Sequence, residues 1–275
     1  MNSSNVCEVA MCLFIIVLFT DFLTLNAVKI EKVILPDVIQ SQAPEGAILD
    51  CLYTVNSSQF TLQWLFNNSD VPVYEWKPNT EPVVGELLEG RLDLSYRAST
   101  FSTDERRALH IVSLEPNLSG EYTCKVVSDG LEARLSRSML VFSPERDFTL
   151  VLQKQNRSTR LQCIARGVYP KPELTLEHDS VPFVRQQQRV WRSDGPLFDA
   201  ESTATLHVNG EYCRPRRITC RLQLPQAGYA AMKKELIYVD GQQNCRNGSS
   251  ASTSSTILFL ALLTITFYSS KTAFL

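Results

Sequence analysis

The sequence predicts an all-β protein with two β-sandwich domains in tandem, an N-terminal signal peptide and a C-terminal hydrophobic tail. Three observations predict this: short alternating stretches, two cysteine pairs at sandwich spacing, and apolar runs at both ends of the 275-residue chain. In the stretches apolar residues recur at every second position, and polar or Gly/Pro-bearing segments separate them. They are residues 32–39, 47–55, 60–66, 71–76, 91–96, 108–114, 120–128 and 133–142, then 148–153, 159–169, 173–179, 204–209, 217–224 and 234–239.

The first set of stretches surrounds Cys51, Trp64 and Cys124. Cys51 precedes Trp64 by 13 positions and Cys124 by 73, and Tyr122 stands in the pattern Y-x-C. A Cys on strand B, a Trp on strand C and Y-x-C on strand F form the immunoglobulin spacing. We therefore expect a variable-type immunoglobulin-like domain over residues 28–143, with Tyr122 bonded to upstream backbone. In the chain-entropy model a bridge over this separation stabilises the fold by about 4 kcal/mol.

One position departs from that pattern. Immunoglobulin domains often place Asp four residues before the Tyr of Y-x-C, paired with an Arg at the start of strand D. Here that position is Leu118, although Arg91 is present. We expect the ion pair either to be absent or to be replaced by one with Glu115.

The second set of stretches predicts a constant-like domain over residues 144–241, joined to the first near Ser143. Cys163 and Cys220 are 57 positions apart, a constant-type separation, and CIARGVYPKPELTL resembles the run from strand B into strand C. The Trp expected on strand C is missing, and its place falls near Glu177 or His178. The inward positions of strand C are expected to be Leu174 and Leu176.

Two further cysteines, Cys213 and Cys245, are expected to pair and to attach a stalk to the second domain. The alternative pairing is Cys163 with Cys213, which needs a shifted strand F. After removal of a signal peptide six cysteines remain, and no CxxC pair is present. This count favours disulfide bonds over a metal site, and none of the residues is expected to bind a metal.

The two ends of the chain predict export and attachment to a membrane. Residues 9–20 form an apolar run typical of a signal peptide over residues 1–27. A Ser/Thr-rich stalk over 242–256 precedes a hydrophobic tail over 257–275. The tail fits a glycosylphosphatidylinositol (GPI) signal with attachment at Asn247, or a short transmembrane segment. The localisation expected is the extracellular side of the plasma membrane. N-glycosylation sequons begin at Asn56, Asn67, Asn117, Asn156 and Asn247, the last being fortuitous if it carries the anchor.

The sequence contains no recognisable constellation of catalytic residues. His110, His178 and His207 fall on separate stretches, and no nucleophile motif, P-loop or dinucleotide fingerprint occurs. Acidic and basic residues are interspersed and the formal net charge is -2, which indicates no nucleic-acid partner. We expect neither enzymatic activity nor a cofactor.

The run VILPDVIQSQAPEGAILDCLYTV, followed by QWLF and VPVYEW, resembles the start of the insect beaten-path proteins. The resemblance covers about 100 residues and implies a neuronal recognition molecule that binds a sidestep-family immunoglobulin protein, in axon guidance or synaptic targeting. Butyrophilin-like and costimulatory ligands share the same two-domain plan. The alternatives are therefore an immune-type costimulatory ligand, or a secreted or shed module that sequesters a soluble ligand.

The partner is expected to bind the sheet that carries strands G, F, C and C′, a face that variable-type domains commonly use. Outward positions are expected to include Gln63 and Leu65 on strand C and Lys125 on strand F. Tyr74 and Trp76 in strand C′ are candidate aromatic anchors. The alternative for these two aromatics is that they cover the edge of the core.

Overall fold

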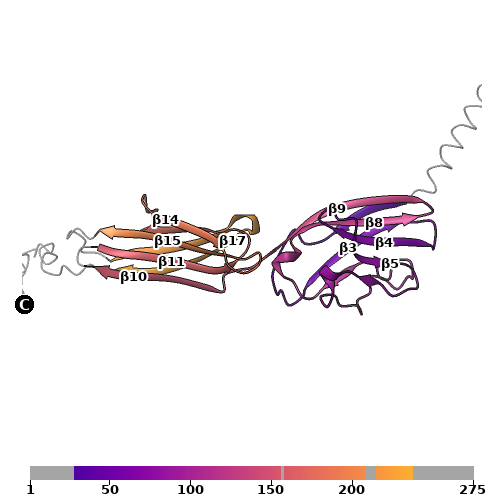
Figure 1. Cartoon of the computed structure of the whole chain (residues 1–275), viewed down its shortest axis with the longest axis horizontal. Helices are drawn as coiled ribbons and strands as arrows, with labels where there is room; N and C mark the ends of the chain where they lie inside the picture. The colour runs from indigo at the N-terminus through magenta and orange to yellow at the C-terminus, as the bar shows by residue number, and fades with distance from the viewer. Residues whose placement is uncertain (1–27, 156–157, 208–214, 238–275) are drawn as a thin grey trace, which may run out of the picture.

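The computed structural model describes residues 28–155, 158–207 and 215–237, which form two β-sandwiches arranged end to end (Figure 1). The predicted signal peptide, stalk, tail and Cys213–Cys245 bridge lie outside the described residues, as do Asn156 and Asn247. Among the described residues, no helical segment has the length and apolar character that a membrane span requires. The predicted all-β, two-sandwich fold is confirmed.

The first sandwich packs a three-stranded sheet against a six-stranded sheet. The smaller has the order β1 (Lys29–Ile34), β3 (Ala47–Thr54) and β7 (Leu109–Ile111). The larger has the order β2 (Val38–Gln40), β9 (Leu131–Phe142), β8 (Gly120–Ser128), β4 (Phe60–Phe66), β5 (Pro72–Trp76) and β6 (Val83–Val84). The stretch predicted as one strand over 32–39 is divided between the sheets, because Pro36 cannot donate to a ladder and β2 pairs in parallel with β9.

The core of the first sandwich surrounds the Cys51–Cys124 disulfide, as the spacing predicted. Trp64 lies opposite Cys124 in the β4–β8 ladder and is fully buried. The Tyr122 hydroxyl donates to the carbonyl oxygen of Leu118 at 2.9 Å, which confirms the expected bond to upstream backbone. Burial raises the pKa of Tyr122 above its ordinary value.

The predicted replacement of the buried ion pair is also confirmed. Arg91 Nη2 lies 2.8 Å from Glu115 Oε2, at the surface rather than in the core. Leu118 fills the interior in place of the carboxylate and is fully buried.

The predicted strand over residues 91–96 is wrong, since only an isolated bridge joins Leu92 to Ile111. The reason is local. The Asp93 carboxylate accepts hydrogen bonds from the backbone nitrogen and the hydroxyl of Ser95, which turns the chain away from the sheet.

The second sandwich contains two four-stranded sheets. One has the order β10 (Asp147–Gln155), β11 (Ser158–Val168), β15 (Phe198–His207) and β14 (Gln187–Arg192). The other has the order β13 (Val181–Pro182), β12 (Glu173–His178), β16 (Arg216–Leu224) and β17 (Tyr229–Ile237). The expected Cys163–Cys220 disulfide joins them. Short 3-10 helices occur in both sandwiches: η1 (Glu86–Leu88) and η2 (Pro116–Leu118) in the first, and η3 (Pro225–Ala227) in the second.

In the second domain, the strand-C position that usually holds a Trp is not the one expected from the sequence. Trp64 lies opposite Cys124 in the first domain, and Leu176 lies opposite Cys220 in the second. The place therefore belongs to Leu176 rather than to Glu177 or His178, because only the inward parity of β12 reaches the disulfide. Leu174 and Leu176 are both buried, as expected.

The two sandwiches are joined by residues that follow β9 directly. Ser143 and Tyr169 exchange backbone hydrogen bonds of 2.9 and 3.0 Å, which fix the connection to the second sandwich. The Tyr229 hydroxyl donates to Glu145 at 2.9 Å, and its ring packs on Phe142.

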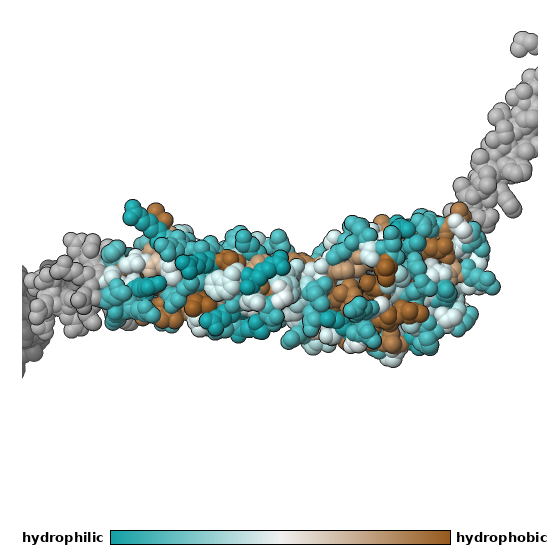
Figure 2. Space-filling model, viewed as in Figure 1, coloured by the Kyte–Doolittle hydropathy of each residue, from teal (hydrophilic) through white to brown (hydrophobic). Residues whose placement is uncertain are grey.

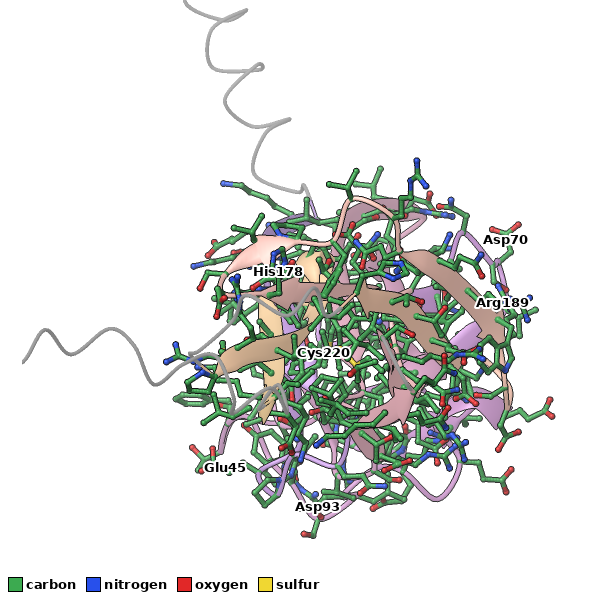
Figure 3. All side chains as sticks on the ribbon, turned by 90° about the vertical axis from the view of Figure 1, so that its left-hand side faces the viewer. Glu45, Asp70, Asp93, His178, Arg189 and Cys220 are labelled. Carbon is green, nitrogen blue, oxygen red and sulfur yellow. A yellow bond between two sulfur atoms is a disulfide. The ribbon has the colours of Figure 1, made fainter. Side chains whose placement is uncertain are left out.

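Viewed along the long axis, Cys220 lies in the interior while Glu45, Asp70, Asp93 and Arg189 lie around the rim (Figure 3).

Candidate functional site

The outer face of the six-stranded sheet carries a row of polar side chains across four strands. Gln63 on β4 lies opposite Glu75 on β5 and Lys125 on β8, and Lys125 lies opposite Arg134 on β9. The row forms because these residues have the parity opposite to that of Trp64 and Cys124. The structure thus places Gln63 and Lys125 on the outward face, as the sequence predicted. We call Gln63, Glu75, Lys125 and Arg134, together with Glu132, the polar row.

Hydrogen bonds and ion pairs among its own members hold the side chains of the polar row in place. Gln63 Nε2 donates to Glu75 Oε2 at 2.8 Å. Glu132 lies 3.1 Å from Arg134 Nε and 3.4 Å from Lys125 Nζ. Hydrogen bonds from Arg134 and then Lys125 hold the pKa of the Glu132 carboxyl below its usual range. These pairs are partly open to solvent, so they contribute little to stability. They present an ordered surface in which the cations Lys125 and Arg134 lie side by side, with Glu132 beside them.

The prediction that Leu65, Tyr74 and Trp76 are outward contact residues is wrong. Tyr74 and Trp76 are 3% and 1% exposed, because they lie opposite Trp64 and Leu62 and share their inward parity. The alternative, that they cover the edge of the core, is the correct one. Leu65 does have the outward parity, but it is only 4% exposed and lies between Pro72 and Thr123 in the sheet.

The hydroxyls of buried Tyr74 and half-buried Tyr53 hold the connection between β6 and β7. The Tyr74 hydroxyl donates to Arg106 O at 2.9 Å, and the Tyr53 hydroxyl donates to Thr103 O at 2.7 Å. Burial raises the pKa of both phenols above the ordinary value. Arg107 anchors the same segment through two hydrogen bonds of 2.9 and 3.2 Å to the carboxylate of Asp50.

This anchored segment presents an apolar residue that the strand pattern did not single out. Phe101 is 71% exposed, and Leu94 in the same connection is half exposed. Figure 2 shows several apolar patches on the first domain within a mostly hydrophilic surface. The available signal was an isolated aromatic in the run STFST, where neighbouring Ser and Thr residues favour an exposed turn. A partner-binding surface can use such a residue as an anchor.

The described sequons lie at the ends of the first sandwich. Asn56 is in the β3–β4 connection and Asn67 follows the far end of β4, so they mark opposite ends. Asn67 has a positive φ, and its Oδ1 accepts a hydrogen bond from Glu121 N at 2.9 Å. All three described sequon asparagines, Asn56, Asn67 and Asn117, are exposed, and none belongs to the polar row.

The part of the chain that the structure describes contains no cluster of metal-ligating side chains. No group of three or more His, Cys, Asp or Glu side chains there could hold a metal ion. His110 lies beside Asp93 and Glu45 O, whereas the ring of His178 packs on Phe183 in the other domain.

Comparison with known proteins places the fold in a class. No protein-family model matches the sequence, and no curated protein matches it. Among solved structures, bovine butyrophilin has a TM-score of 0.60 at 16% identity, covering 74% of this chain and 95% of that one. Rst D1-D2 has a TM-score of 0.55 at 16% identity, covering 76% and 97%. A chain from the crystal structure of ICOS in complex with ICOS-L and an anti ICOS-L VNAR domain has a TM-score of 0.53 at 13% identity, covering 73% and 99%.

These similarities, together with the two disulfides, establish that the chain has a tandem immunoglobulin-like fold. At these identities they establish the fold alone. The resemblance to the beaten-path family stays a prediction.

Proposed function

We propose that this chain is a cell-surface recognition protein that binds another immunoglobulin-superfamily protein through the outer face of β5, β4, β8 and β9. The observation that carries this proposal is the polar row, an ordered arrangement of acidic and basic side chains that contains no sequon asparagine. A face whose central polar row carries no sequon asparagine can bury area against a partner, and its charges can select the partner and its register.

The contact residues that we propose differ from those expected from the sequence. Gln63 and Lys125 remain partner-binding candidates from the sequence. Glu75 and Arg134 join them from the neighbouring strands, while Tyr74 and Trp76 support the face from beneath. Phe101 is a candidate apolar anchor outside the row.

The finer role rests on resemblance. The likeness to beaten-path proteins supports a sidestep-like partner and a role in axon guidance or synaptic targeting at the outer face of the plasma membrane. The solved complex of ICOS with ICOS-L is a protein complex that includes a chain of similar fold, which supports the type of partner. An immune-type costimulatory ligand is the second candidate.

A binding screen of the tagged, secreted two-domain chain against cell-surface immunoglobulin proteins tests the proposal. Once a partner is found, Lys125→Glu with Arg134→Glu should weaken binding about tenfold or more, because both substitutions reverse charges in the row. The matched control is Arg160→Glu with Arg189→Glu, which makes the same charge change on the second domain. Equal affinities for both double variants would contradict the proposed face.

The mode of attachment needs its own experiment. We propose a lipid anchor at Asn247, with a short transmembrane segment as the alternative. Release of the protein from intact cells by a phosphatidylinositol-specific phospholipase is the expected result. Constitutive appearance in the medium without the enzyme would instead favour the shed or secreted binding module.

A further inference from the structure

A cavity of about 510 Å³ lies where the two sandwiches meet. The first domain lines it with residues 40–42 and 114–117, the junction with 143–146, and the second domain with the β14–β15 turn at 194–197. Its volume is within the range of about 300–1,000 Å³ that is usual for ligand sites. Among the described residues, no hydrogen bond or ion pair crosses it from 114–117 to the β14–β15 turn.

Asn117, a sequon asparagine, stands in the wall of this cavity. It is the middle residue of η2 and is exposed, while Leu118 beside it is fully buried. Arg91 Nη1 donates to Asn117 Oδ1 at 3.4 Å, so the amide nitrogen, which is the atom that carries an N-linked glycan, is the branch that does not face Arg91. The third sequon residue, Ser119, is fixed by hydrogen bonds with the backbone of Val141.

We propose that an N-linked glycan on Asn117 fills this cavity and braces the first domain against the second. The lining suits a neutral oligosaccharide. Gln40, Gln42 and Asp194 offer partners for sugar hydroxyls, and the partly exposed Pro116 and Pro196 offer apolar surface for the C–H faces of pyranose rings. Through both kinds of contact, a glycan would connect the first domain to the β14–β15 turn of the second. No hydrogen bond or ion pair among the described residues makes that connection from 114–117.

The junction itself makes such a brace effective. Ser143 exchanges backbone hydrogen bonds with Tyr169, and Arg146 N donates to Arg166 O at 2.8 Å. These bonds fix the connecting residues to the second sandwich. The first sandwich is held to them through β9 and a 2.7 Å hydrogen bond from Ser41 N to Phe142 O. A glycan that starts on η2 and reaches the β14–β15 turn adds a second, separate point of support.

The inference shares with the proposed function the premise that the chain is exported, and the first experiment separates the two. Mass spectrometry of the full chain from secretory cells should find glycan on the peptides of both Asn56 and Asn117. Glycan at Asn56 with none at Asn117 would overturn this inference alone. Absence from every sequon would count against both.

The second experiment measures the brace. In Asn117→Gln, tryptic cleavage after Arg146, which lines the cavity, should become about tenfold faster because the junction loses its cover. Small-angle X-ray scattering should show a broader range of interdomain distances. Asn56→Gln, which removes a glycan from the β3–β4 end, is the matched control and should leave both measurements at the wild-type value. An occupied Asn117 whose replacement changes neither measurement would overturn the proposal.

Discussion

At the residue scale, the core of the first domain uses Leu118 where many immunoglobulin domains bury a carboxylate. We expect Leu118→Ala to cost about 2–5 kcal/mol of unfolding free energy, because a fully buried side chain is lost and a cavity remains. Arg91→Ala should cost only about 0–1 kcal/mol, since its pair with Glu115 is at the surface. Denaturant unfolding of both variants checks this, and equal losses would contradict the division of roles.

Buried tyrosines make the first domain sensitive to alkaline pH. Burial raises the pKa of Tyr53, Tyr74 and Tyr122 above the ordinary value of 10.0. The unfolded chain therefore releases these protons first, so the stabilisation they give is complete below pH about 10 and is lost as the pH rises further. Tyr74→Phe should flatten the fall in unfolding free energy as the pH rises from about 10 to about 12. An unchanged slope, measured by urea unfolding, would show that Tyr74 does not contribute.

Residues whose role follows from spacing along one strand were predictable, and residues whose role depends on a neighbouring strand were not. Cys51, Trp64 and Tyr122 belong to the first group. Tyr74 and Trp76 belong to the second, because their parity depends on pairing with β4. Glu75 between them was the available signal, since a charged residue flanked by aromatics in a strand indicates that the aromatics face inward.

At the scale of elements, apolar alternation predicted the central strands and the edge strand β10, but not the edge strand β14. The predicted stretches at 60–66 and 120–128 coincide with β4 and β8, whose inward residues are apolar. No apolar alternation predicted β14, because it lies at a sheet edge and its sequence QQRVWR is mostly polar. For the same reason, the sequence pattern did not predict the β14–β15 turn or the cavity that this turn helps to form.

The turn that leads into β3 depends on a glycine. Gly46 has a φ of +65°, and a Cβ there would meet the backbone oxygen of Ile111 on β7. We expect Gly46→Ala to destabilise the first domain by about 3 kcal/mol or more, because left-handed strain adds to overpacking.

Gly90 is the matched control for Gly46. It has a similar φ of +69°, but no atom lies within 4 Å of the place that a Cβ would occupy. Gly90→Ala should therefore cost only the strain, about 1–2 kcal/mol. Thermal unfolding of both variants measures the difference, and equal losses would mean that the contact with β7 is relieved by a shift of the turn.

At the scale of the whole molecule, each sandwich has a core of its own. The buried cluster around Cys51–Cys124 and the one around Cys163–Cys220 share no residue. Polar and aromatic contacts at residues 142–146 connect them, which is typical of a modest interface between domains that can fold separately. A substitution that changes partner binding by one domain can therefore leave the folding of the other domain intact.

Separate cores predict separate unfolding. Calorimetry of the two-domain chain should show two transitions, and replacing both Cys163 and Cys220 by Ala should lower only one of them. The loss expected is about 2–5 kcal/mol, because the unfolded chain regains the entropy that the bridge removes. Lys125→Glu with Arg134→Glu should leave both transitions nearly unchanged, since these side chains are partly exposed and their pairs are weak. If the cysteine replacement lowered both transitions equally, the junction would couple the sandwiches strongly, and a brace at Asn117 would then have little left to add.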